Sequence, residues 1–184
     1  YSAGGVVCAG AIVRRPDLWA GGLLRQTVLH MLRYEYGAGG PPNVPEFGST
    51  LTRRGARALR AMDPFTALRP GVRYPPMLAL VGANDPRVPI WHAMKWVARL
   101  QDAAAGRPLA ALLRVEFHAG HGHGSTRRQI IRELADRYAF ALAACRVAQR
   151  APDAAPHPIS AALPAHPPLT RLADRAETGE APAA

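Results

Sequence analysis

Tyr1-Ser2-Ala3-Gly4-Gly5, with an apolar segment behind it, is the stretch that decides the fold of this chain. It matches the second part of a G-x-S-x-G nucleophile elbow, a sharp turn between a strand and a helix that presents a serine hydroxyl at the top of a sheet. The two glycines predict that the helix passes close to the strand. The N–H of Ala3 would lie at the helix N-terminus, where it can face a developing oxyanion. Because Ser-x-Gly-Gly is equally typical of a plain turn, the interpretation depends on a base and an acid downstream.

The length and composition are those of one globular domain. The chain has 184 residues, of which 48% are hydrophobic, which suits a buried core. It begins inside a motif and has no initiator methionine, so we expect the C-terminal part of a longer protein, with any targeting signal upstream of Tyr1. No apolar run approaches the length of a membrane span, and we expect a cytoplasmic protein without a membrane partner. Cys8 and Cys145 are predicted to be buried, unpaired thiols.

The formal net charge of +10 comes from arginine, because Lys95 is the one lysine among 23 basic residues. An arginine bias beside abundant alanine, proline and glycine is typical of a codon-composition effect. The arginines are scattered along the chain, and aromatic residues that would stack on bases are not interleaved with them. We therefore expect no nucleic-acid partner, although the charge favours non-specific adhesion to polyanions.

Apolar runs and amphipathic segments alternate along the chain. This alternation predicts an α/β fold with a parallel sheet flanked by helices and joined by right-handed crossovers. From residue 150 onward the sequence is rich in alanine and proline, which predicts a disordered tail over 150–184 behind a folded region over 1–149. The predicted strands are 22–29, 77–81 and 112–117, and the main predicted helices are 6–14, 51–62, 89–104 and 125–147, the last capped by Ser125.

Two polar loops follow predicted strands, where sites form in open α/β sheets. The first carries Asp85 and the second carries His121. Together with Ser2 they give the chain order Ser, Asp, His, which is the order of α/β-hydrolase triads. A serine hydroxyl needs an imidazole to remove its proton, and a carboxylate to orient that imidazole and stabilise its charged form. Three weak signals in the right order favour a serine hydrolase.

Each loop also has a structural interpretation. Asp85 precedes a proline and is typical of a turn. His118, His121 and His123 form an H-x-x-H-x-H pattern that matches no strong metal motif, and no cysteine or carboxylate lies nearby in the sequence. We therefore predict no metal and no cofactor.

The combined motifs resemble the C-terminal part of the catalytic domain of prolyl oligopeptidase-type serine peptidases over residues 1 to about 145. Residues 1–149 would then be the C-terminal part of an α/β-hydrolase domain. The resemblance implies an α/β-hydrolase domain that carries a β-propeller in the complete enzyme, so the propeller and the first half of the hydrolase domain would be partners absent from this chain. It also implies cleavage of short peptides. The matching segments are Ser2-Ala3-Gly4-Gly5, Arg15-Pro16-Asp17-Leu18, Met31-Leu32-Arg33-Tyr34, Pro45-Glu46-Phe47-Gly48, Tyr74-Pro75-Pro76, Asp85-Pro86-Arg87-Val88-Pro89 and Ala119-Gly120-His121-Gly122.

The resemblance implies residue roles. Ser2 would be the nucleophile, Asp85 the orienting acid, His121 the base and Ala3 an oxyanion donor. Arg87 would hold a substrate carbonyl, which suits its fixed charge and planar donor fork. The apolar pocket positions correspond to Val28, Phe47 and Val88.

Several departures leave the specificity open. Asn43 stands where the family usually has a tryptophan that stacks on the substrate proline, and His30 stands where an aspartate is usual. The run from Asp85 to Val88, with the tryptophans that follow it, is also similar to oligopeptidase B, which cleaves after basic residues. We predict a serine oligopeptidase that cleaves after proline. The alternatives are cleavage after arginine or lysine, an esterase of the same fold, and an inactive remnant. We expect residues 1–184 alone to be inactive.

Overall fold

The computed structural model describes residues 1–104, 111–122 and 125–149 and confirms the predicted α/β fold. In this part of the chain three parallel strands lie in the order β1-β2-β3, and β2 pairs with both neighbours. Their bounds are Gly22–Arg25 for β1, Met77–Gly82 for β2 and Ala111–Glu116 for β3. The α-helices are α1 (Gly4–Arg14), α2 (Val44–Phe47), α3 (Arg53–Met62), α4 (Trp91–Ala103) and α5 (Arg127–Gln149), and the 3₁₀ helices are η1 (Pro16–Leu18), η2 (Met31–Tyr36) and η3 (Pro41–Asn43).

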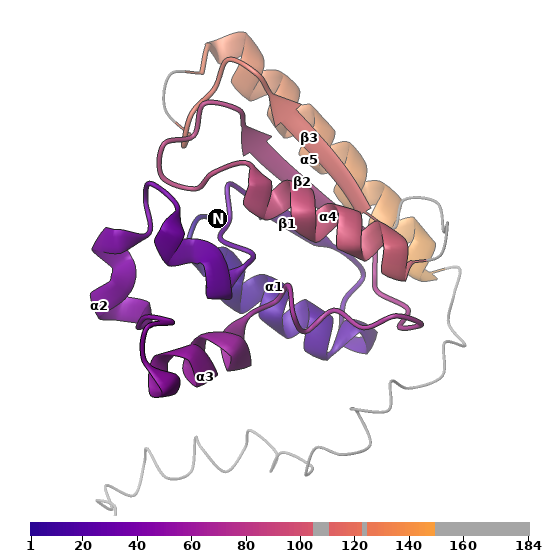
Figure 1. The fold of residues 1–184 in the computed structure, drawn as a ribbon. Coiled ribbons are helices and arrows are strands. Elements are labelled where there is room, and N and C mark those ends of the chain that lie inside the picture. Colours follow the sequence, from indigo (N-terminus) through magenta and orange to yellow (C-terminus); the bar gives the residue numbers. More distant parts are fainter. Residues whose placement is uncertain (105–110, 123–124, 150–184) are drawn as a thin grey trace, which may run out of the picture.

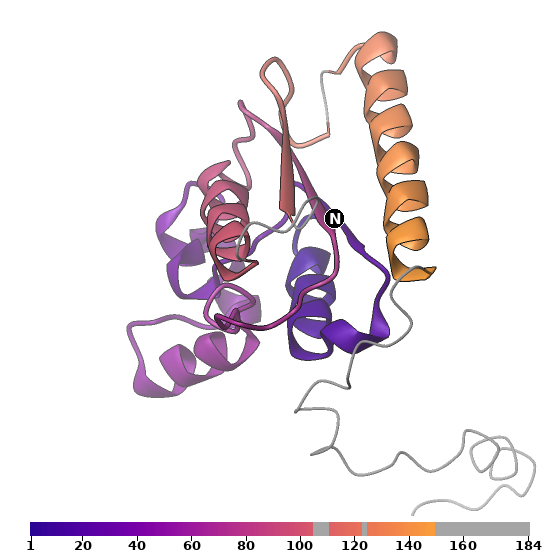
Figure 2. The ribbon, with the colours of Figure 1, turned by 90° about the vertical axis from the view of Figure 1, so that its right-hand side faces the viewer.

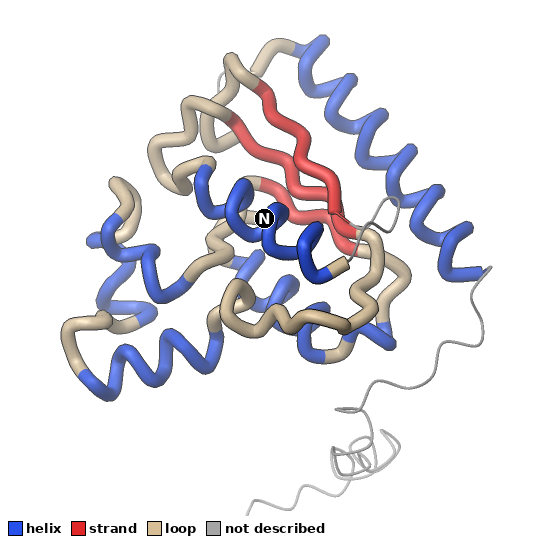
Figure 3. Tube along the Cα trace, turned by 45° about the vertical axis from the view of Figure 1, so that its right-hand side comes forward, coloured by secondary structure: helices blue, strands red, loops and turns tan. Residues whose placement is uncertain are grey.

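The sheet is the middle layer of three (Figures 1 and 2). Helices α1 and α4 cover one face and α5 lies on the other, as Figure 3 also shows. Every residue of β2 is buried, as expected for the central strand of a parallel sheet covered on both faces. The side chains of β2 alternate between the layers: Ala79 joins the main core with Trp96 of α4, whereas Leu78 and Leu80 pack against Phe140 of α5.

Several element ends differ from the sequence prediction. Strand β1 ends at Arg25, because Gln26 adopts a positive φ of 49° and turns the chain out of the sheet. Thr126, and not Ser125, caps α5: its hydroxyl accepts from the N–H of Gln129, while its own N–H donates to the Gln129 side chain. This reciprocal pair is a capping box.

The two cysteines are exposed and free, so the prediction that Cys8 and Cys145 are buried is wrong, although neither forms a disulfide. The predicted tail over 150–184 lies outside the described residues. Within the described ranges, no helix combines the length and the apolar character that crossing a bilayer requires.

Candidate active site

The segment around Ser2 has the geometry of a nucleophile elbow. Ser2 adopts a positive φ of 52°, an uncommon conformation for a residue with a side chain. Its N–H donates to the carbonyl of Arg25 at the end of β1, at 3.1 Å. A Cβ on Gly5 would overlap the Thr27 side chain, so Gly5 allows α1 to approach the chain that leaves β1. Gly4 has open space at the same position and makes no such approach.

The loop after β2 holds the Asp85 carboxylate in one orientation. Its Oδ1 accepts hydrogen bonds from the N–H groups of Arg87, at 2.8 Å, and Val88, at 2.9 Å. Asp85 is therefore a turn former, as one of the two sequence interpretations predicted. Because Oδ1 is engaged by the backbone, Oδ2 points away from the turn toward the loop after β3.

The loop after β3 presents His121 to that carboxylate. The carbonyl of Ala119 accepts from the N–H of Asn84, at 3.1 Å, which joins this loop to the loop after β2. Gly82, at the end of β2, has no side chain, and a Cβ there would overlap the carbonyl oxygens of Ala119 and Gly120. The hydroxyl of Tyr1 donates to the His121 carbonyl at 3.0 Å. These contacts place the imidazole between the two other predicted triad residues.

The structure brings Ser2, Asp85 and His121 into one chain of hydrogen bonds. Asp85 Oδ2 lies 2.6 Å from His121 Nδ1, and His121 Nε2 lies 3.0 Å from Ser2 Oγ. The acid and the imidazole are almost fully buried, with side-chain exposures of 1% and 3%. A carboxylate only accepts, so Nδ1 carries the proton of the neutral ring and Nε2 accepts from the serine hydroxyl. The arrangement can transfer a proton away from Ser2 Oγ.

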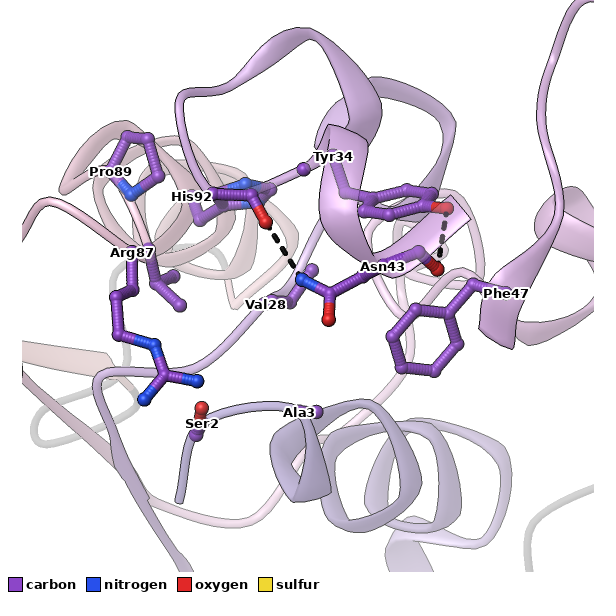
Figure 4. A pocket seen from close by; sticks show the side chains of 12 residues that line it. Ser2, Ala3, Val28, Tyr34, Asn43, Phe47, Arg87, Pro89 and His92 are labelled. Atoms are coloured by element: carbon purple, nitrogen blue, oxygen red, sulfur yellow. Dashed lines mark hydrogen bonds between the residues drawn. The ribbon is translucent and has the colours of Figure 1, made fainter. Parts of the chain in front are cut away.

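A pocket opens beside Ser2 (Figure 4). All five side chains that the resemblance assigned to substrate binding line it, together with Ser2 and with Ala3, the N-cap residue of α1. Sequence reasoning missed the others. The Tyr34 hydroxyl donates to the carbonyl of Gly48 at 2.6 Å. The one sequence signal that could have identified Tyr34 as a pocket residue is its place in the matching segment Met31-Leu32-Arg33-Tyr34. The lining residues are Ser2, Ala3, Val28, Tyr34, Gly39, Gly40, Asn43, Phe47, Arg87, Val88, Pro89 and His92.

Two polar side chains give the pocket its chemistry. The Asn43 side-chain amide donates to the carbonyl of Gly39 at 2.7 Å, which directs its Oδ1 toward the pocket (Figure 4). The guanidinium of Arg87 extends toward Ser2 in the same view. None of the described residues that line the pocket carries a carboxylate. The pocket therefore combines apolar walls with one amide and one cation.

A buried histidine supports the wall of the pocket. His92, at the start of α4, is 1% exposed and stacks against Trp91 at 3.8 Å between ring centroids. Its Nδ1 accepts from the N–H of His30, whose own ring lies 3.1 Å from Asp63. Burial lowers the pKa of His92 to about 3, and the His30 imidazole acts in the same direction. His92 is therefore neutral at physiological pH.

The predicted absence of metal concerns the histidine-rich loop. His118 is exposed, and His123 lies outside the described residues. No group of three metal-ligating side chains occurs within the part of the chain that the structure describes.

A profile of the prolyl oligopeptidase family matches residues 1–147. Prolyl endopeptidases of Elizabethkingia miricola and Elizabethkingia meningoseptica are 31% and 30% identical to the chain, each match covering 77% of this chain and 20% of the relative. A solved prolyl endopeptidase structure is 34% identical with a TM-score of 0.75, over 79% of this chain and 21% of that one.

The chain spans about a fifth of the length of the curated relatives that it matches. The match nevertheless includes the elbow, both polar loops and the pocket, and it extends over most of this chain. The chain belongs to the prolyl oligopeptidase family.

Proposed function

We propose that the protein is a serine peptidase that hydrolyses short peptides by acyl transfer. Ser2 is the nucleophile, His121 the general base and Asp85 the group that orients the base. The observation that carries the proposal is the continuous path from Asp85 Oδ2 through the His121 ring to Ser2 Oγ, with steps of 2.6 Å and 3.0 Å. Both distances lie within the range required of a general base.

The reaction follows from these positions. His121 Nε2 removes the Ser2 proton as Oγ attacks the scissile carbonyl, and Asp85 stabilises the imidazolium that forms. The carbonyl π electrons move onto the oxygen, which faces the N–H of Ala3 at the N-terminus of α1. The imidazolium then gives its proton to the leaving amine, and the C–N bond breaks. Water, activated by the same histidine, hydrolyses the acyl-enzyme and restores Ser2.

The pocket favours an uncharged side chain at the residue before the cleaved bond. Its walls include Val28, Phe47 and Val88, and its described lining offers no carboxylate that could pair with arginine or lysine. The Arg87 guanidinium would repel a basic side chain, whereas it can donate to a substrate carbonyl. These features favour cleavage after proline over cleavage after basic residues. The names of the prolyl endopeptidases among the relatives support the same preference.

Two parts of the proposal extend beyond this chain. The matched part of the chain is about a fifth of the length of the relatives. We propose that a propeller domain and the first half of the hydrolase domain complete the enzyme. They would supply the strand beside β1 and restrict access to short peptides.

The experiment measures the hydrolysis of three reporter substrates by the full-length protein. We expect hydrolysis of a Gly-Pro reporter to exceed that of a Gly-Arg reporter, and both to disappear in Ser2→Ala. Ser49→Ala is the matched control, because the Ser49 hydroxyl donates to Glu35 and not to His121. A nitrophenyl ester tests the esterase alternative: its hydrolysis without peptide cleavage would contradict the proposal. If none of the reporters is hydrolysed in a Ser2-dependent way, the protein is an inactive remnant.

A further inference from the structure

Gln26 carries two irregularities that packing alone does not explain. It has a positive φ of 49°, although it is neither glycine nor asparagine. It is also buried, with 5% exposure, and its Oε1 is the one buried side-chain nitrogen or oxygen atom in the described residues without a hydrogen-bond partner. A left-handed backbone and an unpaired buried acceptor both lower stability. Such irregularities concentrate at functional sites, which directs attention to what Gln26 contacts.

Gln26 lies in a segment that contacts the nucleophile by its backbone. The carbonyl of Arg25 accepts from the N–H of Ser2 at 3.1 Å, and the N–H of Val28 donates to the Ser2 carbonyl at 3.4 Å. The N–H of Gln26 donates to Leu80 of β2 at 2.8 Å. The sheet therefore fixes this segment, and the segment in turn fixes the elbow.

The side chain of Gln26 contacts the loop that carries the base. Its Nε2 donates to the carbonyl of Gly120, the residue before His121. The same carbonyl accepts from the N–H of Gly122 at 2.9 Å. Tyr1 holds the next carbonyl, because its hydroxyl donates to the His121 carbonyl at 3.0 Å. Both carbonyls beside the base are thus held by residues that adjoin the nucleophile or its support.

We propose that Gln26 is a positioning residue that sets the distance between the base and the nucleophile. Its backbone neighbours hold Ser2 and its side-chain amide holds the Gly120 carbonyl, so one residue connects both partners of the 3.0 Å contact between His121 Nε2 and Ser2 Oγ. Gln26 touches no substrate and takes no part in proton transfer. The effect of Gln26 on catalysis rests on the proposed function. Its effect on the placement of His121 does not, because that placement is measurable without substrate.

The test replaces Gln26 by methionine, which keeps the length of the side chain and removes its amide. Gln101→Met is the matched control, because the Gln101 Nε2 also donates to a backbone carbonyl, that of Ala111, at 2.9 Å. Ala111 begins β3, at the end of that strand opposite to the His121 loop. Each variant loses one hydrogen bond from a side-chain amide to a backbone carbonyl. Only the bond lost in Gln26→Met lies beside the base.

The measurement is the proton on His121 Nδ1, observed by NMR in the full-length protein and assigned by its absence in His121→Ala. We expect its exchange with water to become about fivefold faster in Gln26→Met, the equivalent of about 1 kcal/mol for one hydrogen bond. Gln101→Met should leave it unchanged, and Tyr1→Phe should act in the same direction as Gln26→Met. A second spectrum, correlating the ring protons with both ring nitrogens, reports the tautomer and is expected to show more of the Nε2–H form in Gln26→Met.

These results separate the inference from the proposed function. Equal effects of Gln26→Met and Gln101→Met, or no change in exchange and tautomer, would overturn the positioning role whether or not the protein cleaves peptides. In the full-length protein we expect Gln26→Met to lower kcat and leave KM unchanged. An inactive wild-type protein with an intact effect on the His121 proton would overturn the proposed function and leave the positioning role standing.

Discussion

The Asp85 carboxylate and the His121 imidazole meet through one defined pair of atoms. Asp85 Oδ2 lies 2.6 Å from His121 Nδ1, while Oδ1 accepts from the N–H groups of Arg87 and Val88. The two oxygens therefore cannot exchange roles without breaking the turn. This asymmetry determines what each substitution at Asp85 would do.

Asp85→Asn is expected to lower kcat by about 10⁴, the size of effect seen when a triad aspartate is replaced by its amide. The two backbone N–H groups still require an acceptor, so the variant's NH₂ group must face His121 Nδ1. The ring would then be protonated on Nε2 and unable to accept the Ser2 proton. The check is kcat on the Gly-Pro reporter.

The control for Asp85→Asn is Asp63→Asn. Asp63 also accepts a backbone N–H, that of Phe65, with one oxygen and faces a histidine, His30, with the other. It should lower thermal stability with a far smaller effect on kcat. An equal loss of kcat in both variants would show that Asp85 has only a structural role.

His121→Ala is expected to lower kcat by several orders of magnitude, whereas His118→Ala and His123→Ala should have small effects. Triad members act as a unit, so loss of the base removes most of the contribution of the group. His118 is exposed and stands outside the chain of hydrogen bonds. Steady-state kinetics of the three variants provides the check. Similar losses in all three would favour a metal or structural cluster of histidines.

Asn43→Trp should raise kcat/KM on the Gly-Pro reporter. A ring at this position would stack on the substrate proline and restore about 0.5–1.5 kcal/mol of contact. Asn43→Ala is the control, because it removes the bond to Gly39 without adding a ring. If Asn43→Trp instead leaves proline cleavage unchanged, and the wild-type protein cleaves the Gly-Arg reporter faster, the specificity is that of oligopeptidase B.

Residues 1–184 expressed alone should not react with a fluorophosphonate serine probe. Strand β1 is an edge strand in the described sheet. The backbone of the Ser2 elbow is bonded to the segment at the end of β1, through the carbonyl of Arg25. A nucleophile that is not held in one position loses the orientation that can supply about 7–11 kcal/mol of the barrier. Mass spectrometry of the labelled chain is the measurement. Stoichiometric labelling of Ser2 that His121→Ala abolishes would disprove this prediction.

Acid should destabilise the fold through His92. Its pKa is lowered by burial to about 3, from the 6.5 of an exposed histidine, so the unfolded chain binds a proton more readily. The contribution to stability is complete above pH 6.5 and decreases as the pH falls toward 3, by at most about 1.4 kcal/mol per pH unit. Urea unfolding at several pH values checks this. His92→Gln should flatten the profile between pH 6.5 and 5, and His118→Gln should not.

Local sequence determined the elements and the identity of the candidate site. The apolar run at 77–81 has no polar alternation, because a central parallel strand is covered on both faces, and all of β2 is buried. The small residues after Ser2 are a local signal of a tight turn before a helix. The chain order of Ser2, Asp85 and His121 reflects the topology of the sheet. The structure places these three side chains together, and their catalytic role stays a prediction.

Tertiary structure decided the distances and the supporting contacts. Ser2 and His121 are 119 residues apart in sequence, and their 3.0 Å contact depends on the register of β1, β2 and β3 and on the hydrogen bonds between the loops. Nothing in the residue pattern marks Gln26, because its role arises from a backbone turn and a carbonyl in a distant loop. The direction of the Asn43 amide likewise follows from the Gly39 carbonyl. Propensity and periodicity are local properties, whereas these contacts exist only when the sheet brings distant loops to one edge.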